Sequence, residues 1–429
     1  MTDRQGGGVG FTWTELTPEE LSLQAEVREF LAAELGGPGP SGEPRRPGLG
    51  MNGAPSREFS RKLGARGWLG MALPKRYGGA ERSAVDRFIV TEELLRYGAP
   101  VGHHWLADRQ TGAVINKFGT QSQKERFLPG ISSGEFGFSV GLSEPDAGSD
   151  LAAVRTRAVR SGDRWVINGT KVWTTGAHRN DYIVLLARTS DEPDRHDGLT
   201  QFIVDLAAPG VQVRPIPMLD GSADFNQVVL DDVTVGDDAV LGDLGRGWSQ
   251  TAAELALERG GPDRFMTIYP VFEVFLREAE PSSLETDGHV RRFLGRSTAT
   301  FWVLRNLSLA VARAVDRGEP AIQEAALVKE MATRFEQDLI TALLDVIDTE
   351  PVCDSPSVFE RILCEAVLTR PIFTIRGGTN EVLRSVAAKG ITAAGAAAAA
   401  SAAAGNTAAG NTAAGSVAVG SVARKGNDR

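Results

Sequence analysis

Apolar residues recur at intervals of three and four in the first and last thirds of the chain, the period of an amphipathic helix. The first helix is expected to begin after Thr17, because a threonine cap, Pro18 at the first helical position and acidic residues in the first turn mark a helix start. The other predicted helices are 59–67, 84–95, 105–118, 121–128, 248–259, 290–317, 321–346 and 356–368.

The pattern changes between residues 137 and 245, where short runs of β-branched and aromatic residues stand between turn signals. Ser161-Gly162-Asp163 and Asn168-Gly169 are both typical of hairpin turns. Expected strands include 182–187, 201–204 and 228–230. The pattern predicts an α+β protein, with a small central β-barrel or sandwich between an N-terminal helical domain and a C-terminal helical bundle.

The order of these patterns divides the chain into five segments. We expect a flexible N-terminus over 1–14, a helical domain over 15–136, a β-domain over 137–245, a second helical domain over 246–392 and a tail over 393–429. In the tail, glycine recurs every five residues, at 405, 410, 415 and 420. This composition buries too little apolar area to offset the entropy of ordering, so the tail is predicted to be disordered.

Charge, cysteine content and hydropathy exclude several classes of protein. With 46 basic and 55 acidic residues and a net charge of −9, the chain lacks the basic excess of nucleic-acid binders. Cys353 and Cys364 fit a reducing compartment and predict no disulfide framework, and the five histidines lack metal-ligand spacing. No apolar run reaches the roughly 20 residues of a membrane span. We therefore expect a cytoplasmic protein without a metal site.

Two motifs in the β-region carry the candidate chemistry. SEPDAGSD at 143–150 favours a tight loop that offers hydroxyl and N–H donors to a ligand. NGTKVWTT at 168–175 ends in Trp173 and Thr175, which are two residues apart and so share a strand face. On spacing alone, these residues also fit an ordinary β-domain with a buried tryptophan. In this order and at this separation, however, the two motifs closely resemble the flavin-binding signature of acyl-CoA dehydrogenases.

The resemblance extends over residues 15–392, with a W-x-G-x-x-x-P-x-x-Y-G-G run at 68–79 that is similar to the family's N-terminal helical domain. It implies FAD as cofactor, an acyl-CoA substrate oxidised between its α and β carbons, and an electron-transferring flavoprotein as acceptor. It also implies a homodimer or homotetramer, or a heterotetramer with a paralogue. In this chemistry a carboxylate removes the α proton, the flavin N5 accepts the β hydride, and donors hold the thioester carbonyl.

The resemblance also implies roles for individual residues. Those implied for FAD are Leu142, Ser143, Gly148, Ser149, Trp173, Thr175, Thr379 and Glu381, and those implied for the substrate are Ser149 and Arg259. Arg376 is a further candidate for the substrate because it stands next to Gly377-Gly378, where the family often has an aromatic residue. Two alternatives stay open. Thr379 and Glu381 also fit a helix start capped by threonine, and Arg376 also fits a salt-bridge residue.

The catalytic base is the main departure from the family pattern. Where much of the family has its catalytic glutamate, this chain has Gly377, whose backbone N–H can still donate to the thioester carbonyl. In a second arrangement the base precedes an arginine on a C-terminal helix, and Glu258 before Arg259 matches it. The resemblance thus implies Glu258 as the base, and a carboxylate restored at Gly377 as a partial substitute for it. Without the resemblance, Glu258 would be a solvated helix residue or a partner of Arg259 or Arg264.

Two further motifs of the family are weak or absent. The segment 290–295 matches the family's Arg-x-x-Phe-Gly motif only loosely, and no glycine-rich run follows Thr349. Either the chain is a divergent branch with altered adenine contacts, or a partner subunit completes its site. Three functions therefore stay open: an acyl-CoA dehydrogenase, a non-catalytic or half-site subunit of a heteromeric one, and a flavin-dependent acyl-CoA oxidase.

Overall fold

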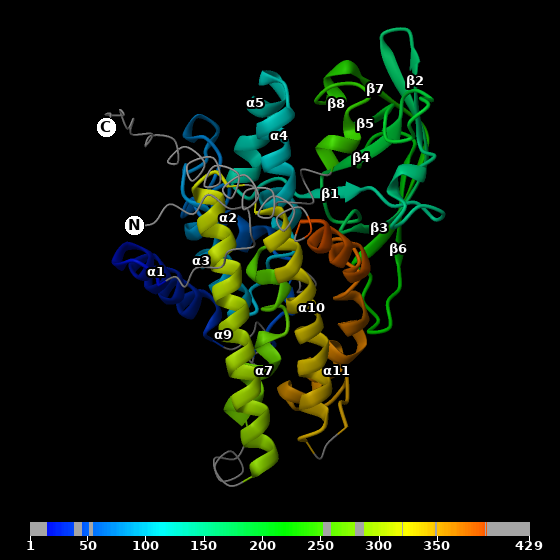
Figure 1. Ribbon diagram of the computed structural model, residues 1–429. Helices are drawn as coiled ribbons and strands as arrows, with labels where there is room; N and C mark the ends of the chain where they lie inside the picture. The colour runs from blue at the N-terminus through cyan, green and yellow to red at the C-terminus, as the bar shows by residue number, and fades with distance from the viewer. Residues whose placement is uncertain are drawn as a thin grey trace, which may run out of the picture.

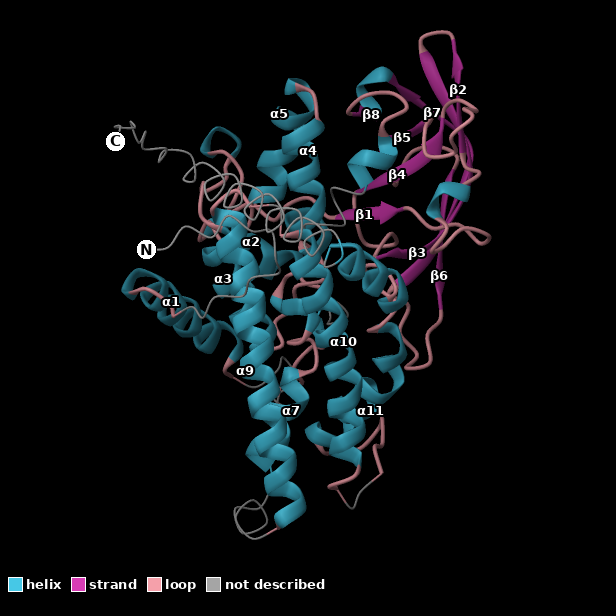
Figure 2. Cartoon of the chain, viewed as in Figure 1, coloured by secondary structure: helices cyan, strands magenta, loops and turns pink. Residues whose placement is uncertain are grey.

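The computed structural model describes residues 15–37, 45–50, 55–251, 259–278, 287–319, 321–347, 350–390 and 392. The expected flexible N-terminus and disordered tail lie outside these residues, as does most of the helix expected at 248–259. Figure 1 shows the helices of both ends of the chain lying together, with the sheet to one side of them. The same division is visible by secondary structure in Figure 2. The α+β architecture predicted from the sequence is confirmed.

The N-terminal helices begin where the sequence supplies caps. In α1 (Pro18–Leu35) the Thr17 side chain accepts from the Glu20 N–H, and the Glu20 side chain accepts from the Thr17 N–H. Thr120 and Gln123 form the same reciprocal box at the start of the last of these helices. The remaining elements are α2 (Arg57–Ala65), the 3₁₀ turn η2 (Lys75–Tyr77), α3 (Ala84–Arg96), the π-helical turn η3 (Ala107–Thr111), α4 (Gly112–Phe118) and α5 (Gln121–Ser132).

The C-terminal helices share one apolar core with the first three helices. They are α7 (Tyr269–Glu278), α9 (Gly288–Asp316), α10 (Ile322–Leu344), α11 (Val358–Thr369) and a last helix over 380–390, with 3₁₀ turns η6 (Pro262–Arg264) and η7 (Arg370–Ile372). Leu31, Ile89, Leu309 and Ile362 are each fully buried in this core. Two ion pairs, Glu20 with Arg313 and Glu92 with Arg305, also join α9 to α1 and α3. None of the described helices is long and apolar enough to cross a membrane.

The β-domain is a single sheet with a core of its own. Its strands are β1 (Phe138–Gly141), β2 (Arg157–Ser161), β3 (Arg164–Thr175), β4 (Tyr182–Arg188), β5 (Leu199–Asp205), β6 (Val211–Ile216), β7 (Phe225–Gly236) and β8 (Val240–Leu241). Their order is β6-β7-β3-β2-β4-β5-β8, and β1 pairs in parallel with β4. Packing of Phe127 from α5 on Phe138 and Tyr182 joins the sheet to the N-terminal helices.

One of the two expected hairpins is wrong. Gly162 has the positive φ of a turn between β2 and β3, as expected, but Asn168 and Gly169 lie inside the continuous strand β3. The ladder with β7 shifts register between Ile167 and Gly169, so the pair forms a bulge. A Cβ at Gly169 would lie 2.4 Å from Oγ1 of Thr156, and the Asn168 side chain bonds Asp232 on β7. Gly169 is therefore required by its close contact with Thr156, and not by a reversal of the chain.

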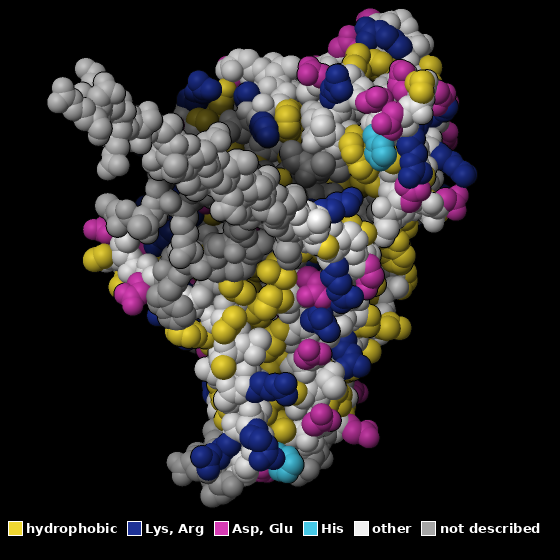
Figure 3. Space-filling view, in the orientation of Figure 1, with side chains coloured by type: hydrophobic (Ala, Val, Ile, Leu, Met, Phe, Trp, Pro, Cys, Tyr) yellow, Lys and Arg dark blue, Asp and Glu magenta, His cyan; other side chains and the backbone are white. Residues whose placement is uncertain are grey.

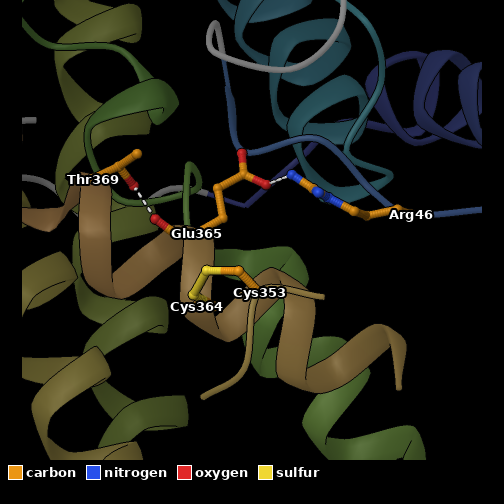
Figure 4. Close-up of a disulfide and its surroundings, with 5 residues drawn as sticks. All are labelled: Arg46, Cys353, Cys364, Glu365 and Thr369. Atoms are coloured by element: carbon orange, nitrogen blue, oxygen red, sulfur yellow. Dashed lines mark hydrogen bonds and ion pairs between the residues drawn. A yellow bond between two sulfur atoms is a disulfide. The ribbon is translucent and has the colours of Figure 1, made fainter. Parts of the chain in front are cut away.

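The expectation about the cysteines is also wrong. Cys353 and Cys364 form a disulfide, with their Cα atoms 5.3 Å apart, because the segment before α11 folds back along that helix (Figure 4). Arg361 Nη1 donates to the carbonyl of Pro356 at 3.0 Å and helps to hold this fold-back. The cysteine content therefore no longer supports the expectation of a reducing compartment. Beside the disulfide, Glu365 of α11 pairs with Arg46, which ties α11 to the segment 45–50.

We expect buried His104 to make stability fall on acidification. Its side chain is 3% exposed, its Nδ1 lies 2.8 Å from Oγ of Ser60, and burial lowers its pKa from 6.5 to about 4. The unfolded chain then binds the proton near pH 6.5 and the folded chain only near pH 4. The contribution to the free energy of unfolding is therefore complete above pH 6.5 and falls by up to about 3 kcal/mol between 6.5 and 4.

The measurement is the free energy of unfolding against pH for the native protein, His104→Gln and the control His289→Gln, whose histidine is exposed. The fall in the free energy of unfolding between pH 6.5 and pH 4 should be smaller only in His104→Gln. Equal pH dependence in all three proteins would show that His104 does not carry it.

Candidate functional site

The SEPDAGSD loop and the end of β3 lie side by side. Val172 donates its N–H to the carbonyl of Ser143 at 2.9 Å, and Glu144 and Ala147 close the loop with two backbone hydrogen bonds. Leu142 and Ser143 are half-buried, whereas Gly148 and Ser149 are exposed. A Cβ at Gly148 would meet no atom within 4 Å. The described residues thus leave open space beside the backbone of Gly148.

A buried ion pair supports this loop from below. The ammonium of Lys171 lies 2.8 Å from Oε1 of Glu144 and donates to the carbonyl of Leu142 at 3.1 Å. The other oxygen of Glu144 accepts from the N–H of Arg155 at 2.6 Å. Burial lowers the pKa of Lys171 to about 8. Burial raises the pKa of Glu144, but the charge of Lys171 together with the hydrogen bonds from Lys171, Thr156 and Arg155 lowers it overall. Both residues stand inside the two motifs, yet the sequence analysis assigned no role to either.

Trp173 is the most unusual residue of the site. It has a φ of +59°, and its side chain is 60% exposed. The ladder between β3 and β7 is irregular from Lys171 to Thr174, which turns Trp173 out of the regular pleat. Thr174 is buried, whereas Trp173 is exposed and Thr175 is half-buried. Trp173 and Thr175 are therefore both accessible. A left-handed backbone at a bulky residue is costly, and such strain concentrates at functional sites.

A second group of candidate residues lies in the turn between η7 and the last helix. Gly377 and Gly378 have φ of +69° and +92°, and residues 376–379 are half-buried. Among the described residues, the N–H groups of Gly377, Gly378 and Thr379 donate to no partner. Thr379 Oγ1 accepts from the N–H of Val382 at 3.4 Å, so it caps the last helix, and Glu381 is exposed on that helix. The turn therefore presents a row of backbone donors at an accessible surface.

A cluster of buried charges lies directly behind Gly377. A Cβ at this glycine would lie 2.9 Å from Nη2 of Arg264, whose side chain is almost fully buried. Arg264 contacts Asp263, and Asp263 lies 2.7 Å from Nη2 of Arg109. Burial raises the pKa of Asp263, but the charge of Arg109, followed by that of Arg264, outweighs this and lowers it. The space next to Gly377 is therefore cationic.

Arg376 points into the same cluster. Its Nη2 donates to Oγ1 of Thr267 at 2.9 Å and lies 3.3 Å from Oε2 of Glu336. Burial raises the pKa of Glu336 to about 8, although the charge of Arg376 opposes this. The contact with Glu336 matches the salt-bridge alternative for Arg376.

The predicted site residues therefore fall into two groups. In the first group, Ser143 at the start of the loop with Gly148 and Ser149 accepts from the N–H of Val172, which precedes Trp173 and Thr175. In the second, Arg259 Nη2 lies 3.9 Å from the position of a Cβ on Gly378, beside Gly377 and Arg376. Glu258, the expected base, lies outside the described residues.

Comparison with known proteins covers nearly all of the described chain. Residues 17–135, 139–233 and 245–392 match the profiles "Acyl-CoA dehydrogenase, N-terminal domain", "middle domain" and "C-terminal domain". The chain is 33% identical over 386 residues to acyl-CoA dehydrogenase FadE29 of Mycobacterium tuberculosis (strain ATCC 25618 / H37Rv), covering 88% of this chain and 97% of that protein. It is 33% identical over 383 residues to acyl-CoA dehydrogenase IpdE1 of the same organism, covering 86% and 96%.

Solved structures give the same result. The chain superposes on the Tcur3481-Tcur3483 steroid ACAD with a TM-score of 0.78 and 32% identity, covering 87% of this chain and 97% of that one. It superposes on the ChsE4-ChsE5 complex from Mycobacterium tuberculosis with a TM-score of 0.74 and 29% identity, covering 88% and 97%. Together with the loop and strand end described above, these matches establish that the chain belongs to the acyl-CoA dehydrogenase family of flavoprotein oxidoreductases.

Proposed function

We propose that this protein oxidises an acyl-CoA thioester to the trans-2-enoyl-CoA with bound FAD. The observation that carries the proposal is the site at the end of β3, where an exposed Trp173 with left-handed backbone stands beside the SEPDAGSD loop. A soluble domain rarely keeps a strained, exposed aromatic residue without a use for it. A flat ring system stacked near Trp173 would use that exposure.

The residues present fit FAD. The Ser143 hydroxyl and the exposed Gly148–Ser149 backbone offer hydrogen-bond donors, the space beside Gly148 is open, and Trp173 and Thr175 are accessible from the same strand end. We assign Leu142, Ser143, Gly148, Ser149, Trp173 and Thr175 to FAD binding. When bound, FAD supplies the acceptor for the β hydride of the acyl group. The contact of Thr379 and Glu381 with FAD stays a prediction, because Thr379 already caps a helix.

The chain's own groups perform the two remaining tasks. The N–H groups at 377–379 donate to the thioester carbonyl, where negative charge develops as the α proton leaves. Glu258 removes that proton, because the space at Gly377 contains no carboxylate and is lined by Arg264. Electrons then leave to an electron-transferring flavoprotein.

The substrate class that the relatives favour is a steroid acyl thioester. The support is a 32% identical neighbour that is titled a steroid ACAD. The test is to purify the chain alone, confirm that it is yellow, and follow flavin bleaching without oxygen against straight-chain and steroid side-chain acyl-CoAs. Bleaching by the steroid thioesters supports the full proposal, and bleaching by straight chains alone overturns the substrate class. Oxygen consumption without an added acceptor would indicate an oxidase.

A second candidate is a half-site subunit that acts with a paralogue. Gly377 carries no carboxylate, and two similar structures are titled as pairs of named chains. Figure 3 shows apolar side chains gathered over α9 and α10, where Trp302, Val303, Ile322 and Met331 are among the exposed large hydrophobic residues. Such a face supports association with another chain. If the purified chain is colourless and becomes active only when co-expressed with a paralogue, this candidate replaces the first.

A further inference from the structure

The turn that presents the N–H groups of residues 377–379 is held from the inside by one face of α10. Lys329, Thr333 and Glu336 stand at positions i, i+4 and i+7, so their side chains lie on the same side of the helix. All three are buried, and Lys329 and Glu336 are 0% exposed. Burying a lysine is costly unless its donors are used, so its contacts have to be strong.

The ammonium of Lys329 bonds the turn at three points. It donates to the carbonyl of Gly378 at 2.8 Å, to Oδ1 of Asn380 at 2.8 Å and to the carbonyl of Thr374 at 3.4 Å. Thr333 Oγ1 adds a bond to the same Asn380 oxygen at 3.1 Å. The carbonyl of Thr374 also accepts from the N–H of Asn380 at 3.1 Å, which closes the turn. One side chain thus holds both ends of the turn and the peptide between Gly378 and Thr379.

The direction of that peptide follows from its planarity. In a trans peptide the C=O and the N–H point in opposite directions. Because the Gly378 carbonyl points inward to Lys329, the N–H of Thr379 points outward from α10. Two consecutive glycines at positive φ impose little direction by themselves. The orientation of the donor row therefore depends on an external contact, and Lys329 supplies it.

We propose that Lys329 is a positioning residue of this protein, which aims the backbone donors at 377–379 toward the thioester carbonyl. The inference rests on the proposed function, since it gives these donors a carbonyl to bind. Glu336 anchors the other side of the turn through Arg376. Lys329 and Glu336 of α10 thus both hold the turn, although neither touches the substrate.

The first test needs no substrate. Hydrogen exchange of the FAD-loaded protein is measured for peptides covering 373–383 in the native chain, Lys329→Met and Arg305→Met. Arg305→Met is the matched control, because it removes a comparable interhelical contact, to Glu92 on α3. We expect exchange at the Asn380 N–H to rise about tenfold or more in Lys329→Met, as charge-assisted hydrogen bonds are lost. Unchanged exchange there, or an equal rise in Arg305→Met, overturns the proposal.

The second test reads the carbonyl itself. The infrared band of a ¹³C-labelled thioester carbonyl moves to lower frequency when donors polarise it, so the bound steroid or straight-chain acyl-CoA that bleaches the native protein is used as probe. In Lys329→Met the band should return toward that of the free thioester, and flavin reduction should slow by about 10- to 100-fold. Arg305→Met should keep the native band.

The outcomes separate this inference from the proposed function. If the native protein shifts the band and Lys329→Met shifts it equally, Lys329 has only a structural role and the inference is wrong. If hydrogen exchange responds as expected but the native protein never shifts the band, the turn is not a carbonyl site and the inference is wrong, whereas bleaching by the same thioester still supports the proposed function. A native protein that no acyl-CoA bleaches overturns the proposed function instead.

Discussion

Replacing Glu258 with glutamine is expected to give a yellow protein that still binds acyl-CoA but reduces its flavin about 10²- to 10⁴-fold more slowly, the usual range for a general base. Glutamine keeps the size of the side chain and removes only its basicity. The measurement is anaerobic flavin bleaching in a stopped-flow instrument, with acyl-CoA affinity determined in parallel. Glu254→Gln, four residues earlier in the same predicted helix, is the control. A near-native rate of flavin bleaching in Glu258→Gln would show that Glu258 is not the base that removes the α proton.

The structure changes the expected effect of adding Gly377→Glu to the Glu258→Gln variant. From the sequence, Gly377→Glu is expected to restore part of the activity of Glu258→Gln. In the structure, a side chain at Gly377 would meet the guanidinium of Arg264 at 2.9 Å, on a backbone with φ of +69°. An ion pair there would lower the pKa of the new carboxyl and weaken it as a base. We now expect no gain in bleaching rate over Glu258→Gln, and a clear gain would contradict the placement of Arg264.

The second large effect is expected at the ion pair between Lys171 and Glu144, which supports the SEPDAGSD loop. Lys171→Met should lower the free energy of unfolding by about 3 to 5 kcal/mol, because it leaves the carboxylate of Glu144 buried without its partner. It should also weaken FAD binding, since Lys171 holds the carbonyl of Leu142 next to Ser143. Urea unfolding and FAD release on dilution measure the two effects.

A double-mutant cycle separates the pair from general damage. The double variant Lys171→Met/Glu144→Gln removes both charges. Its decrease in the free energy of unfolding should therefore be clearly smaller than the sum of the decreases in the two single variants. Strict additivity would mean that the two residues do not support each other. Arg157→Met, which removes an exposed pair with Asp191, should leave the free energy of unfolding nearly unchanged, because exposed ion pairs contribute little.

The elements that the sequence predicted correctly are those with local signals. Thr17 and Thr120 mark helix starts because the cap and its partner lie within three residues of one another. Gly162 marks a hairpin because its turn needs a positive φ. Gly169 follows an asparagine in the same kind of turn-like dipeptide, but it lies in a bulge of β3 and packs closely against Thr156. That contact depends on how β2 and β3 pair. A dipeptide cannot distinguish a turn from a bulge when the partner strand decides between them.

The candidate site residues were likewise predictable from the sequence only where the signal is local. The loop and strand motifs were recognisable because the residues proposed to bind FAD stand close together in the sequence. Lys329 was missed because its partners, Gly378 and Asn380, stand about 50 residues away, at separations of 49 and 51. Nothing in an amphipathic helix tells that a lysine faces inward. The Cys353–Cys364 bond was missed for a related reason, since it needs the fold-back of the segment before α11.

The apolar core shared by α1, α2 and α3 with the C-terminal helices has a consequence during synthesis. The N-terminal helices leave the ribosome first, but their packing partners on α9 follow far later: Arg313 contacts Glu20 across 293 residues, and Arg305 contacts Glu92 across 213. The β-domain has its own core and can fold in the interval. The nascent N-terminal third must therefore keep apolar side chains exposed until α9 emerges, which makes it a natural client for chaperones that hold unfolded segments.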